Sequence, residues 1–509
     1  AMGLLPLFGW KLQMVMVVLP VIMLAVANDY GIHLMAKYQE DNRPGAERES
    51  KALAKGVLKS LGLPTITAGV TTMAGLLCLT THIIIPAQQM GVLAAIGVGF
   101  AICGSLMFIP AVLAILPVPE PLAHFGDAGK KGFLDRLLER VAEKVIAVPR
   151  GIIAVSVLLG LLACAGVMKV IVDTNPINYY PPNSPVAQTS SLINKHFGGS
   201  TELSIMLEGD IQDPTVLGRI DELDSRLKEL PQVGTTSGIN QVVRKMHMAV
   251  SDGDASADRI PDNKETVAQL FLLYSMGGDP DDFARMVDFG FERALLKIRI
   301  NSLSTKGISE VVRASEDILE TQQWDKTPIV GGFGAVFADL VEAVVKGQVA
   351  SLLLSFLLVF LMVGSAFRSP VAGVFAVIPL GLAMPMLFGL MGVLGIELNV
   401  VTAMLSSIMI GVGVDYTIHF LWRFRDLRRM GTAPDKAVVE TLTTTGRGIV
   451  FNALSVIIGF AVLLLSQFLP VQFFGFLVVI SISACLIGAL VLLPAICLVV
   501  QPKFLEPEV

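Results

Sequence analysis

Long apolar runs separated by short polar loops make up most of this 509-residue chain. A helix needs roughly 20 apolar residues to cross a hydrocarbon core about 30 Å thick. Nine runs approach or exceed that length, near residues 14–36, 62–82, 86–116, 150–169, 347–367, 370–395, 399–422, 448–467 and 471–500. The pattern predicts a polytopic α-helical membrane protein.

Residues 173–345, between the fourth and fifth runs, have instead the pattern of a water-soluble α/β domain. Strand-like apolar runs alternate there with helix-like 3.6-residue periodicity, at residues 204–207, 214–230, 294–300 and 308–321. A strand-helix-strand order that occurs twice predicts a ferredoxin-like fold, with residues 240–290 as an insertion.

The segment 133–148 is amphipathic. Its apolar residues share one helical face, namely Leu134, Leu137, Leu138, Val141 and Val145. Charged residues occupy the other face. Two interpretations stay open: a helix that lies flat on the inner membrane surface and joins the two halves, or a linker helix that packs against the helix bundle.

The beginning and the end of the chain repeat one another. Two sets of residues recur at the same internal spacing: Gly9, Leu12, Asp29, Tyr30 and His33 as Gly395, Leu398, Asp415, Tyr416 and His419, and Pro86, Gln88, Gly91, Gly104 and Pro110 as Pro470, Gln472, Gly475, Gly488 and Pro494. The offset is 386 residues in the first set and 384 in the second. We therefore expect a tandem repeat of membrane helices.

The first repeat is shorter than the second, because it begins almost at Gly9. If the halves are equal, three spans and a second extracytoplasmic domain precede residue 1, and the nine spans become twelve. Numbered in that way, the predicted organisation is spans four to six at 1–122, an amphipathic cytoplasmic linker at 123–149, span seven at 150–172, an extracytoplasmic α/β domain at 173–345, spans eight to twelve at 346–502 and a cytoplasmic tail at 503–509.

Composition agrees with a membrane location, and charge gives the orientation. The chain is 53% hydrophobic and only 16% charged, which is too apolar for an ordinary soluble protein. Lysine and arginine beside spans stay on the cytoplasmic side. Three loops carry six each: Lys37, Arg43, Arg48, Lys51, Lys55 and Lys59; Lys130, Lys131, Arg136, Arg140, Lys144 and Arg150; and Arg423, Arg425, Arg428, Arg429, Lys436 and Arg447. Residues 173–345 then lie outside the cytoplasm.

Several kinds of partner and chemistry are disfavoured. Residues 173–345 contain 15 basic and 26 acidic residues, a balance that argues against nucleic acid as a partner. The cysteines all lie in apolar runs, so we expect neither a disulfide framework nor a metal cluster: Cys78, Cys103, Cys164, Cys485 and Cys497. Phosphate-binding, zinc-binding and nucleophile motifs are not found, and we expect no cofactor and no enzymatic activity.

Asp29 and Asp415 are the charged residues that lie within spans, away from the span ends. A carboxylate at such a depth costs on the order of 2.5–3.5 kcal/mol on insertion scales, so it normally faces a bundle interior or a water-filled cavity and marks a proton or ion path. The alternative is a protonated aspartate that only hydrogen-bonds a neighbouring helix. Equivalent positions in two repeats favour the proton path, and two adjacent carboxyl groups should share protons.

Other polar residues could extend this proton relay. Tyr30 and Tyr416 follow the aspartates, and His33 and His419 lie one turn toward the cytoplasm on the same helix face. Further candidates in neighbouring spans are Thr67, Thr71, Thr72, Asn452 and Ser455. Ordinary packing or interfacial placement is the alternative for the tyrosines and histidines, and helix–helix hydrogen bonding is the alternative for the others.

Three strings resemble the resistance-nodulation-division (RND) exporters: VANDYGIHLMAKYQ (26–39), GVGVDYTIHFLWRFR (411–425) and the FGG at 197–199 that follows PPNSP. The resemblance covers nearly the whole chain. It is strongest to the branch that holds the mycobacterial membrane protein large (MMPL) family, the hydrophobe-amphiphile efflux group and the hopanoid exporters. It implies twelve spans and proton antiport through spans four and ten, where Asp29, Tyr30, Asp415 and Tyr416 fall. It also implies that residues 173–345 are a periplasmic porter domain and that the protein lies in the inner or plasma membrane of a bacterial or archaeal cell.

The resemblance also implies the activity, which is export of lipids or other hydrophobic or amphiphilic molecules driven by the proton-motive force. The partners are then the lipid bilayer, the substrate and protons, and a homo-oligomer is compatible with the family. Two departures matter. Ala27 and Asn28 stand where the second repeat has Gly413 and Val414, so the two relay sites need not be equivalent. The polar domain is also short for a pump that docks onto an outer-membrane channel.

Two rival functions share this architecture. One is a sterol- or lipid-sensing membrane protein of the Patched-like kind, which would not need both aspartates. The other is a proton-driven accessory of protein secretion, whose signature motifs are not found in the chain.

Overall fold

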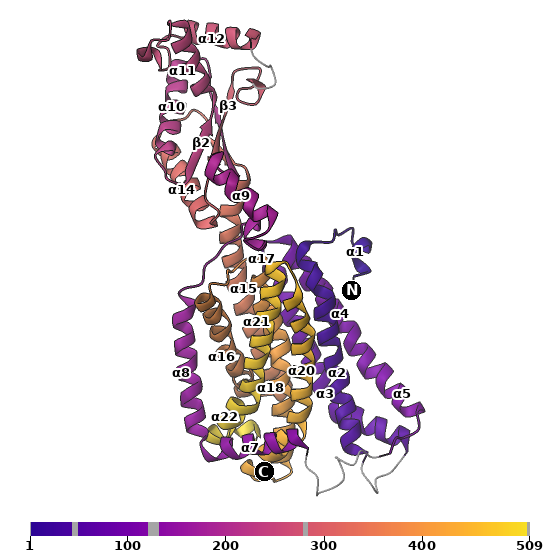
Figure 1. The fold of residues 1–509 in the computed structure, drawn as a ribbon. Helices are drawn as coiled ribbons and strands as arrows, with labels where there is room; N and C mark the ends of the chain where they lie inside the picture. The colour runs from indigo at the N-terminus through magenta and orange to yellow at the C-terminus, as the bar shows by residue number, and fades with distance from the viewer. Residues whose placement is uncertain (1, 43–48, 121–131, 278–282, 506–509) are drawn as a thin grey trace. The chain divides into compact units, whose positions relative to one another are not determined.

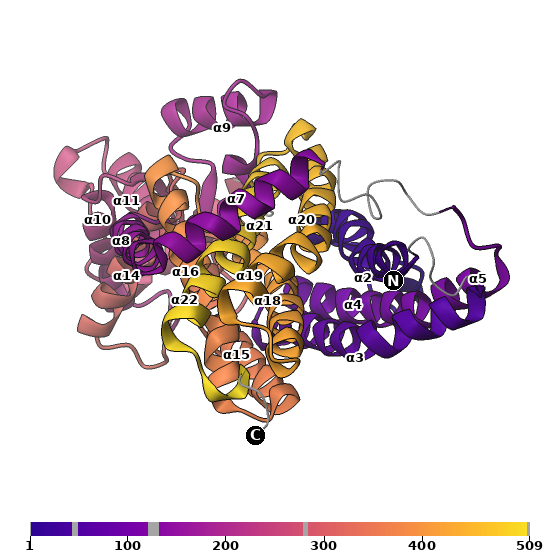
Figure 2. The ribbon, with the colours of Figure 1, turned by 90° about the horizontal axis from the view of Figure 1, so that it is seen from below.

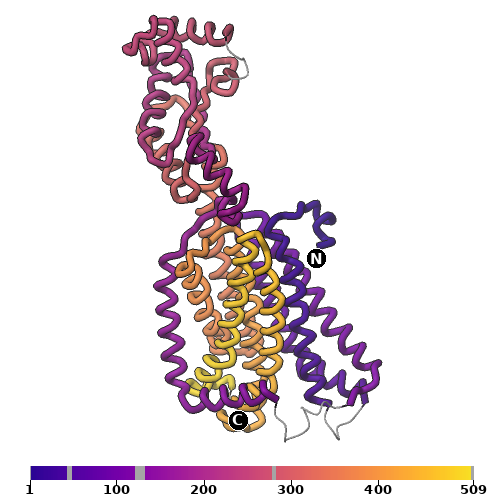
Figure 3. Tube along the Cα trace, viewed as in Figure 1, coloured from indigo at the N-terminus to yellow at the C-terminus, as the bar shows by residue number. Residues whose placement is uncertain are grey.

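A computed structural model describes residues 2–42, 49–120, 132–277 and 283–505. The chain folds into two compact units, which Figures 1 and 3 show along the colour ramp. The membrane unit combines residues Ala1–Ile171 and Ala343–Val509, and the sheet unit is Val172–Glu342. Parts of the predicted loops, linker and tail lie outside the described residues, among them Arg43, Arg48, Lys130, Lys131 and residues 506–509.

Within the described residues, nine helical segments of the membrane unit are long and apolar enough to cross a membrane. This confirms the predicted number of spans. In chain order the helices are α2 (Leu19–Asp41), α3 (Ser50–Leu77), α4 with α5 (Ile85–Cys103 and Ile109–Ile115), α8 (Pro149–Val167), α15 (Phe333–Phe367), α16 (Pro370–Leu394), α17 with α18 (Val400–Ala403 and Leu405–Arg429), α20 (Thr445–Ala461), and α21 with α22 (Leu469–Ile487 and Leu493–Val500).

Local sequence explains where several spans begin. Pro149 and Pro370 lie in the first turns of α8 and α16, where the missing N–H of proline breaks no helical hydrogen bond. Asn399 caps α17, because its side-chain oxygen accepts hydrogen bonds from the backbone N–H groups of Val401 and Thr402, both at 3.0 Å. This cap sets the start of the helix pair that carries Asp415.

The tandem repeat is visible in backbone details. A π-helical turn interrupts each final span, at Gly104–Phe108 and at Gly488–Leu492, which are 384 residues apart. Close approaches recur as well. A Cβ at Gly75 would lie 2.9 Å from Gly411, and a Cβ at the equivalent Gly459 would lie 3.5 Å from Ala25. Helix α3 of the first repeat therefore packs on α18 of the second, while α20 packs on α2.

The two repeats differ in what covers their central helix. The most apolar stretch of the span that contains α18 is fully buried, whereas half of the corresponding stretch in the span of α2 is buried. A Cβ at Gly413 would lie 3.1 Å from Leu380 of α16, but the equivalent Ala27 and its neighbour Asn28 are exposed. The two repeats therefore differ at these positions both in sequence and in packing.

The amphipathic segment forms helix α7 (Phe133–Ala147), which packs against α19 (Pro434–Thr443) beside the ends of the spans (Figure 2). Leu138, Ala142 and Val145 of α7 are buried. Leu137, which the periodicity placed with them, is exposed. The interpretation of a linker helix packed against the bundle accounts for the buried face.

The sheet unit has the predicted ferredoxin-like fold. Its four antiparallel strands lie in the order β2-β3-β1-β4, with two helices that connect them in the strand-helix-strand pattern. The elements are β1 (Thr201–Glu208), α10 (Pro214–Lys228), β2 (Val233–Ser237), β3 (Arg293–Ile300), α14 (Thr305–Thr321) and β4 (Ile329–Gly331). The predicted insertion holds α11 (Ile239–Val250) and α12 (Lys264–Gly277), and α9 (Pro185–His196) precedes β1.

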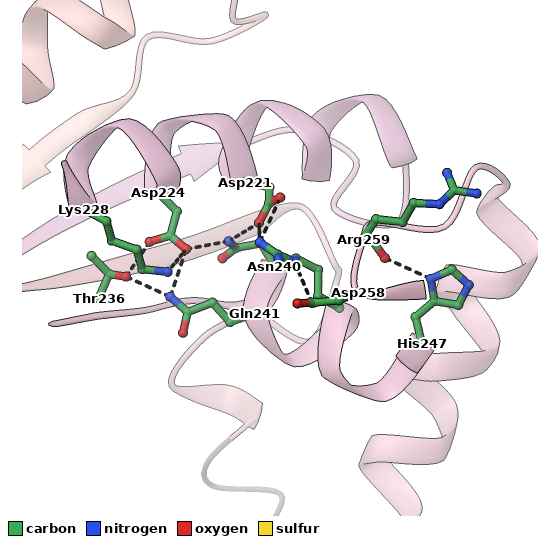
Figure 4. A network of polar contacts seen from close by, with 10 residues as sticks. Asp221, Asp224, Lys228, Thr236, Asn240, Gln241, His247, Asp258 and Arg259 are labelled. Carbon is green, nitrogen blue, oxygen red and sulfur yellow. Dashed lines mark hydrogen bonds and ion pairs between the residues drawn. The ribbon is translucent and has the colours of Figure 1, made fainter. Parts of the chain in front are cut away.

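A polar network ties the insertion to this fold (Figure 4). The buried carboxylate of Asp224 on α10 accepts hydrogen bonds from Asn240 and Gln241 of α11, each at 2.9 Å, and from Thr236 of β2. Lys228 lies 2.9 Å from the same carboxylate. Four donors for one buried carboxylate satisfy the charge, so the network is a structural junction.

Candidate functional site

Asp29 and Asp415 meet inside the membrane unit. Their side chains are 1% and 0% exposed, and their carboxyl groups are neighbours in the bundle. The structure thus brings together the two aspartates that the sequence places deep within predicted spans.

Each aspartate receives a hydrogen-bond donor from the opposite repeat. The amide nitrogen of Asn452 on α20 donates to Asp29 Oδ1. The hydroxyl of Thr72 on α3 lies 3.1 Å from Asp415 Oδ2, 2.8 Å from the Gly411 carbonyl oxygen and 3.1 Å from the Ala68 carbonyl oxygen, and it can donate to one of them at a time. We call these the crossed hydrogen bonds.

The donors do not occupy equivalent positions. At the offset of 384 residues, Asn452 corresponds to Ala68 and Thr72 to Val456. Asp29 therefore has an amide donor, while Asp415 competes with two carbonyl oxygens for the Thr72 hydroxyl. The two carboxyl sites are chemically distinct, as the departure between the repeats had suggested.

The histidines continue the line of titratable groups. His33 Nε2 lies 3.4 Å from Asp29 Oδ1. The rings of His33 and His419 stack with centroids 4.0 Å apart and planes 16° apart, and both are buried. Because each histidine follows its aspartate by four residues, the stacked pair lies about 6 Å further along the bundle, toward the ends of α2 and α18 that carry the cationic loops.

The tyrosines are packed beside the aspartates. Tyr30 and Tyr416 are 1% and 0% exposed, and neither hydroxyl has a hydrogen-bond partner among the residues that the structure describes. Two unpaired phenol groups next to a carboxyl pair can bind water or change partners when the pair gains or loses a proton.

The remaining candidates divide into two groups. Thr72 and Asn452 reach the aspartates. Thr71 is buried and donates to its own helix at the Ala68 carbonyl oxygen, at 2.6 Å, while Thr67 donates to the Leu63 carbonyl oxygen, at 2.9 Å. Thr67 also lines a surface groove. Ser455 is half-buried, one turn beyond Asn452.

Sequence reasoning missed a buried polar cluster at the other end of the bundle. His82, which no motif in the sequence singles out, is 1% exposed and hydrogen-bonds to Ser351 of α15. The signal was present in α15, where polar residues recur every three or four positions in an apolar run: Gln348, Ser351 and Ser355. No group of three metal-ligating side chains occurs within the described ranges.

The comparison with known families assigns the chain. The family model of the MMPL family matches residues 4–150 and 212–507. The chain belongs to the MMPL family. That membership covers both membrane repeats and most of the sheet unit, and it agrees with the RND resemblance that the Asp-Tyr strings carry.

Individual relatives in the family are distant. A membrane protein of Methanocaldococcus jannaschii is 22% identical over 413 residues, which cover 78% of this chain and 97% of that protein. The sulfolipid-1 exporter MmpL8 of Mycobacterium tuberculosis is 29% identical over 28% of this chain and 13% of its own length. The transport protein MmpL9 of the same organism is 26% identical over 45% of this chain and 23% of its own length. The chain thus spans only a small part of these mycobacterial relatives.

Proposed function

We propose that this protein exports lipids or other hydrophobic or amphiphilic molecules from or across the cytoplasmic membrane, driven by protons that bind to Asp29 and Asp415. The carboxyl pair is the observation that carries the proposal. Two neighbouring carboxyl groups are buried within a membrane bundle, where isolated charges are costly and mark proton paths.

The crossed hydrogen bonds supply a link between proton binding and movement. An ionised carboxylate accepts hydrogen bonds more strongly than a protonated one. Since Asn452 and Thr72 each reach across to the other repeat, a proton that arrives at the pair weakens contacts between repeats. A proton that crosses 100 mV releases about 2.3 kcal/mol, which is comparable to the change in one or two such contacts.

Orientation follows from the cationic loops. Helices α2 and α18 end, and α3 begins, beside lysine and arginine residues, and such loops stay in the cytoplasm. We therefore infer that this end of the bundle is cytoplasmic and that residues 173–345 are extracytoplasmic. Protons would then enter at the opposite end and leave past the His33–His419 pair.

The proposed substrate class rests on two observations. The named activity of MmpL8 is export of a sulfolipid. The membrane unit also has an open groove of about 390 Å³ between α3 and α15, lined by Ile66, Val70, Leu361 and Met362 among others. Such a groove suits an acyl chain more than a charged solute.

The decisive experiment replaces each aspartate by the isosteric amide. Purified Asp29→Asn and Asp415→Asn proteins are reconstituted in liposomes that contain a fluorescently labelled phospholipid, and export is followed under an imposed pH gradient. We expect each variant to lose most of the export that the pH gradient drives, because an asparagine amide cannot bind and release the proton that the carboxyl group carries.

The matched control is Ser481→Ala. Ser481 is a buried residue of α21 whose hydroxyl donates within its own helix, to Val478 at 3.0 Å. All three variants should retain the size-exclusion profile and helicity of the wild type. Wild-type export by either aspartate variant contradicts the proton relay, and absence of export by the wild-type protein itself favours a lipid sensor.

A further inference from the structure

Helix α15 carries buried polar residues along one face of its membrane span. Gln348, Ser351 and Ser355 are 5%, 0% and 0% exposed, and their spacing of three and four residues places them on one side of the helix. Leu353 and Leu357 on the other side are largely exposed. A span that turns its polar residues inward and its leucines outward has a polar function inside the bundle.

Two other elements complete this polar stripe. His82, at the end of the 3₁₀ turn η2 (Cys78–Thr81), lies with Nε2 3.2 Å from the Ser351 hydroxyl. Gln348 donates from Nε2 to Ser406 of α18. The contact with His82 is tight, because a Cβ at Gly347 would lie 2.6 Å from His82 Nδ1.

Several atoms of the stripe have no partner among the described residues. They are His82 Nδ1, Gln348 Oε1, the Ser355 hydroxyl and the hydroxyl of Ser407, which follows Ser406 on α18. Ser355 lies beside the Cys78 thiol, a weak hydrogen-bonding group. Buried polar groups in native proteins are nearly always satisfied by protein or water, so four unpaired atoms along one seam indicate bound water.

The stripe leads to Asp415. Ser407 precedes Asp415 by eight residues, or about 12 Å along α18. Between them lies Gly411, whose carbonyl oxygen is 2.8 Å from the Thr72 hydroxyl that also reaches Asp415. His82 marks the far end of the stripe, at the end of the bundle away from the cationic loops. On the other side of the carboxyl pair, Asp29 and the stacked histidines lead toward those loops.

We propose that this stripe is the hydrated entrance through which protons reach Asp415 from the extracytoplasmic end of the bundle. Its members are His82, Gln348, Ser351, Ser355, Ser406 and Ser407. They hold the water chain in place, and Thr72 passes the proton to the carboxyl pair. The entrance rests on the proposed proton coupling, but the solvation of the stripe can be measured without any transport.

The first experiment measures access by cysteine labelling. Ser355→Cys is compared with Leu353→Cys, which lies on the lipid side of α15 at nearly the same depth. Sealed vesicles of either orientation receive 2-aminoethyl methanethiosulfonate on one side, with free cysteine on the other side to quench reagent that crosses. Modification of the α15 peptide is quantified by mass spectrometry.

We expect Ser355→Cys to react at least about tenfold faster than Leu353→Cys, because the reactive thiolate forms only where water is present. The fast reaction should occur only when the reagent is on the extracytoplasmic side. Equal rates for the two cysteines, or fast reaction of Ser355→Cys from the cytoplasmic side alone, would overturn the proposal.

The second experiment measures proton delivery at Asp415 itself. Dicyclohexylcarbodiimide, which reacts with protonated carboxyl groups, is added to vesicles buffered at different pH values on the two sides, and labelled Asp415 and Asp29 are both quantified. Both must be followed, because Asp29, Tyr30 and Tyr416 surround Asp415. We expect more label on Asp415 when the extracytoplasmic side is acidic than when the gradient is reversed.

Ser351→Leu, which fills the stripe with an apolar side chain, should abolish this difference, whereas Leu353→Ser should leave it intact. Labelling of Ser351→Leu that still follows the extracytoplasmic pH would show that protons enter elsewhere. The proposed function is tested by a separate result. If Asp29→Asn and Asp415→Asn export normally, proton coupling is wrong regardless of the labelling.

Discussion

At the scale of single residues, Gly448 of α20 makes room for one of the titratable groups. A Cβ at this position would lie 3.2 Å from His33 Nδ1, closer than most side-chain contacts. Two residues earlier, a Cβ at Gly446 would have its nearest neighbours at 3.6 Å, an ordinary contact distance. Alanine at both positions changes helix propensity, but only alanine at 448 would also displace the His33 ring.

We predict that Gly448→Ala lowers export severalfold while Gly446→Ala leaves it near wild type. Both changes should favour the helix by up to about 1 kcal/mol, but the alanine at 448 pushes the His33 ring away from Asp29 and His419. Proteoliposome export and thermal unfolding, measured on both variants, check this. Equal export by the two variants would show that the position of His33 does not matter.

The candidate residues differ in how far sequence could place them. Asp29 and Asp415 were predictable, because a charge within a span has few explanations and the repeat supplied a second copy. Thr72 was one of three threonines of α3 that sequence could not rank, since adjacent helix positions point about 100° apart and the rotation of α3 is set by its contact with α18. For the same reason, sequence could not predict that Asn452 reaches a carboxyl group while Ser455 does not.

At the scale of helices, the α3–α18 crossing depends on two glycines. A Cβ at Gly75 would lie 2.9 Å from the Gly411 Cα and 3.4 Å from the Ser407 carbonyl oxygen, and backbone atoms cannot move aside as a side chain can. Gly62, on the same helix, has nothing within 4 Å of such a Cβ. Close approach of small residues is a principal source of helix association in membranes.

Gly75→Ala should therefore destabilise the protein by about 1–3 kcal/mol, the usual cost of overpacking, whereas Gly62→Ala should stabilise it or leave it unchanged. The midpoint of thermal unfolding in detergent, followed by tryptophan fluorescence, compares the two. A Gly75→Ala protein as stable as the wild type would mean that α3 and α18 can separate without loss.

Sequence predicted the spans well but not the full length of α15. Its apolar run was expected to begin at 347, whereas the helix begins at Phe333. The part of α15 before residue 347 contains Asp339, Glu342 and Lys346. These charged residues lower its hydropathy, so an apolar run does not predict this part of the helix. The polar stripe escaped notice for a related reason: serine and glutamine lower mean hydropathy too little to interrupt an apolar run.

At the scale of the whole molecule, the sheet unit should respond to acid through Asp224. Burial alone would raise the pKa of this carboxyl group, but hydrogen bonds from Thr236, Lys228, Asn240 and Gln241 outweigh it and lower the pKa. The stabilisation is then complete above the ordinary aspartate value of about 3.9 and is lost as the pH falls through the lowered pKa.

We expect hydrogen exchange in α11 of the intact protein to accelerate when the pH falls below about 4, after correction for the intrinsic rate. At neutral pH, Asp224→Asn should accelerate it in the same helix, with a cost of about 1–3 kcal/mol for the disrupted network. Asp317→Asn, an exposed position on α14, is the control. Exchange in α11 that is the same in both variants would contradict the role of the junction.

The overall architecture was largely predictable, because the order of elements allows few arrangements. Two strand-helix-strand units imply the β2-β3-β1-β4 sheet, and the structure has it. The pairing of α3 with α18 and of α20 with α2 was not predictable, since equal apolar helices can pack in many orders. It became visible only through glycine contacts such as that of Gly459 with Ala25.

The crossed hydrogen bonds have a consequence for how the duplicated halves evolve. Asn452 belongs to the second repeat but serves Asp29, and Thr72 of the first repeat serves Asp415. Neither repeat holds a whole carboxyl site, so we expect that two polypeptides encoded by a gene split between the repeats must associate before the proposed proton relay can form. We expect selection to act on a substitution in one half through its effect on the carboxyl site of the other half, so the two halves should not diverge independently.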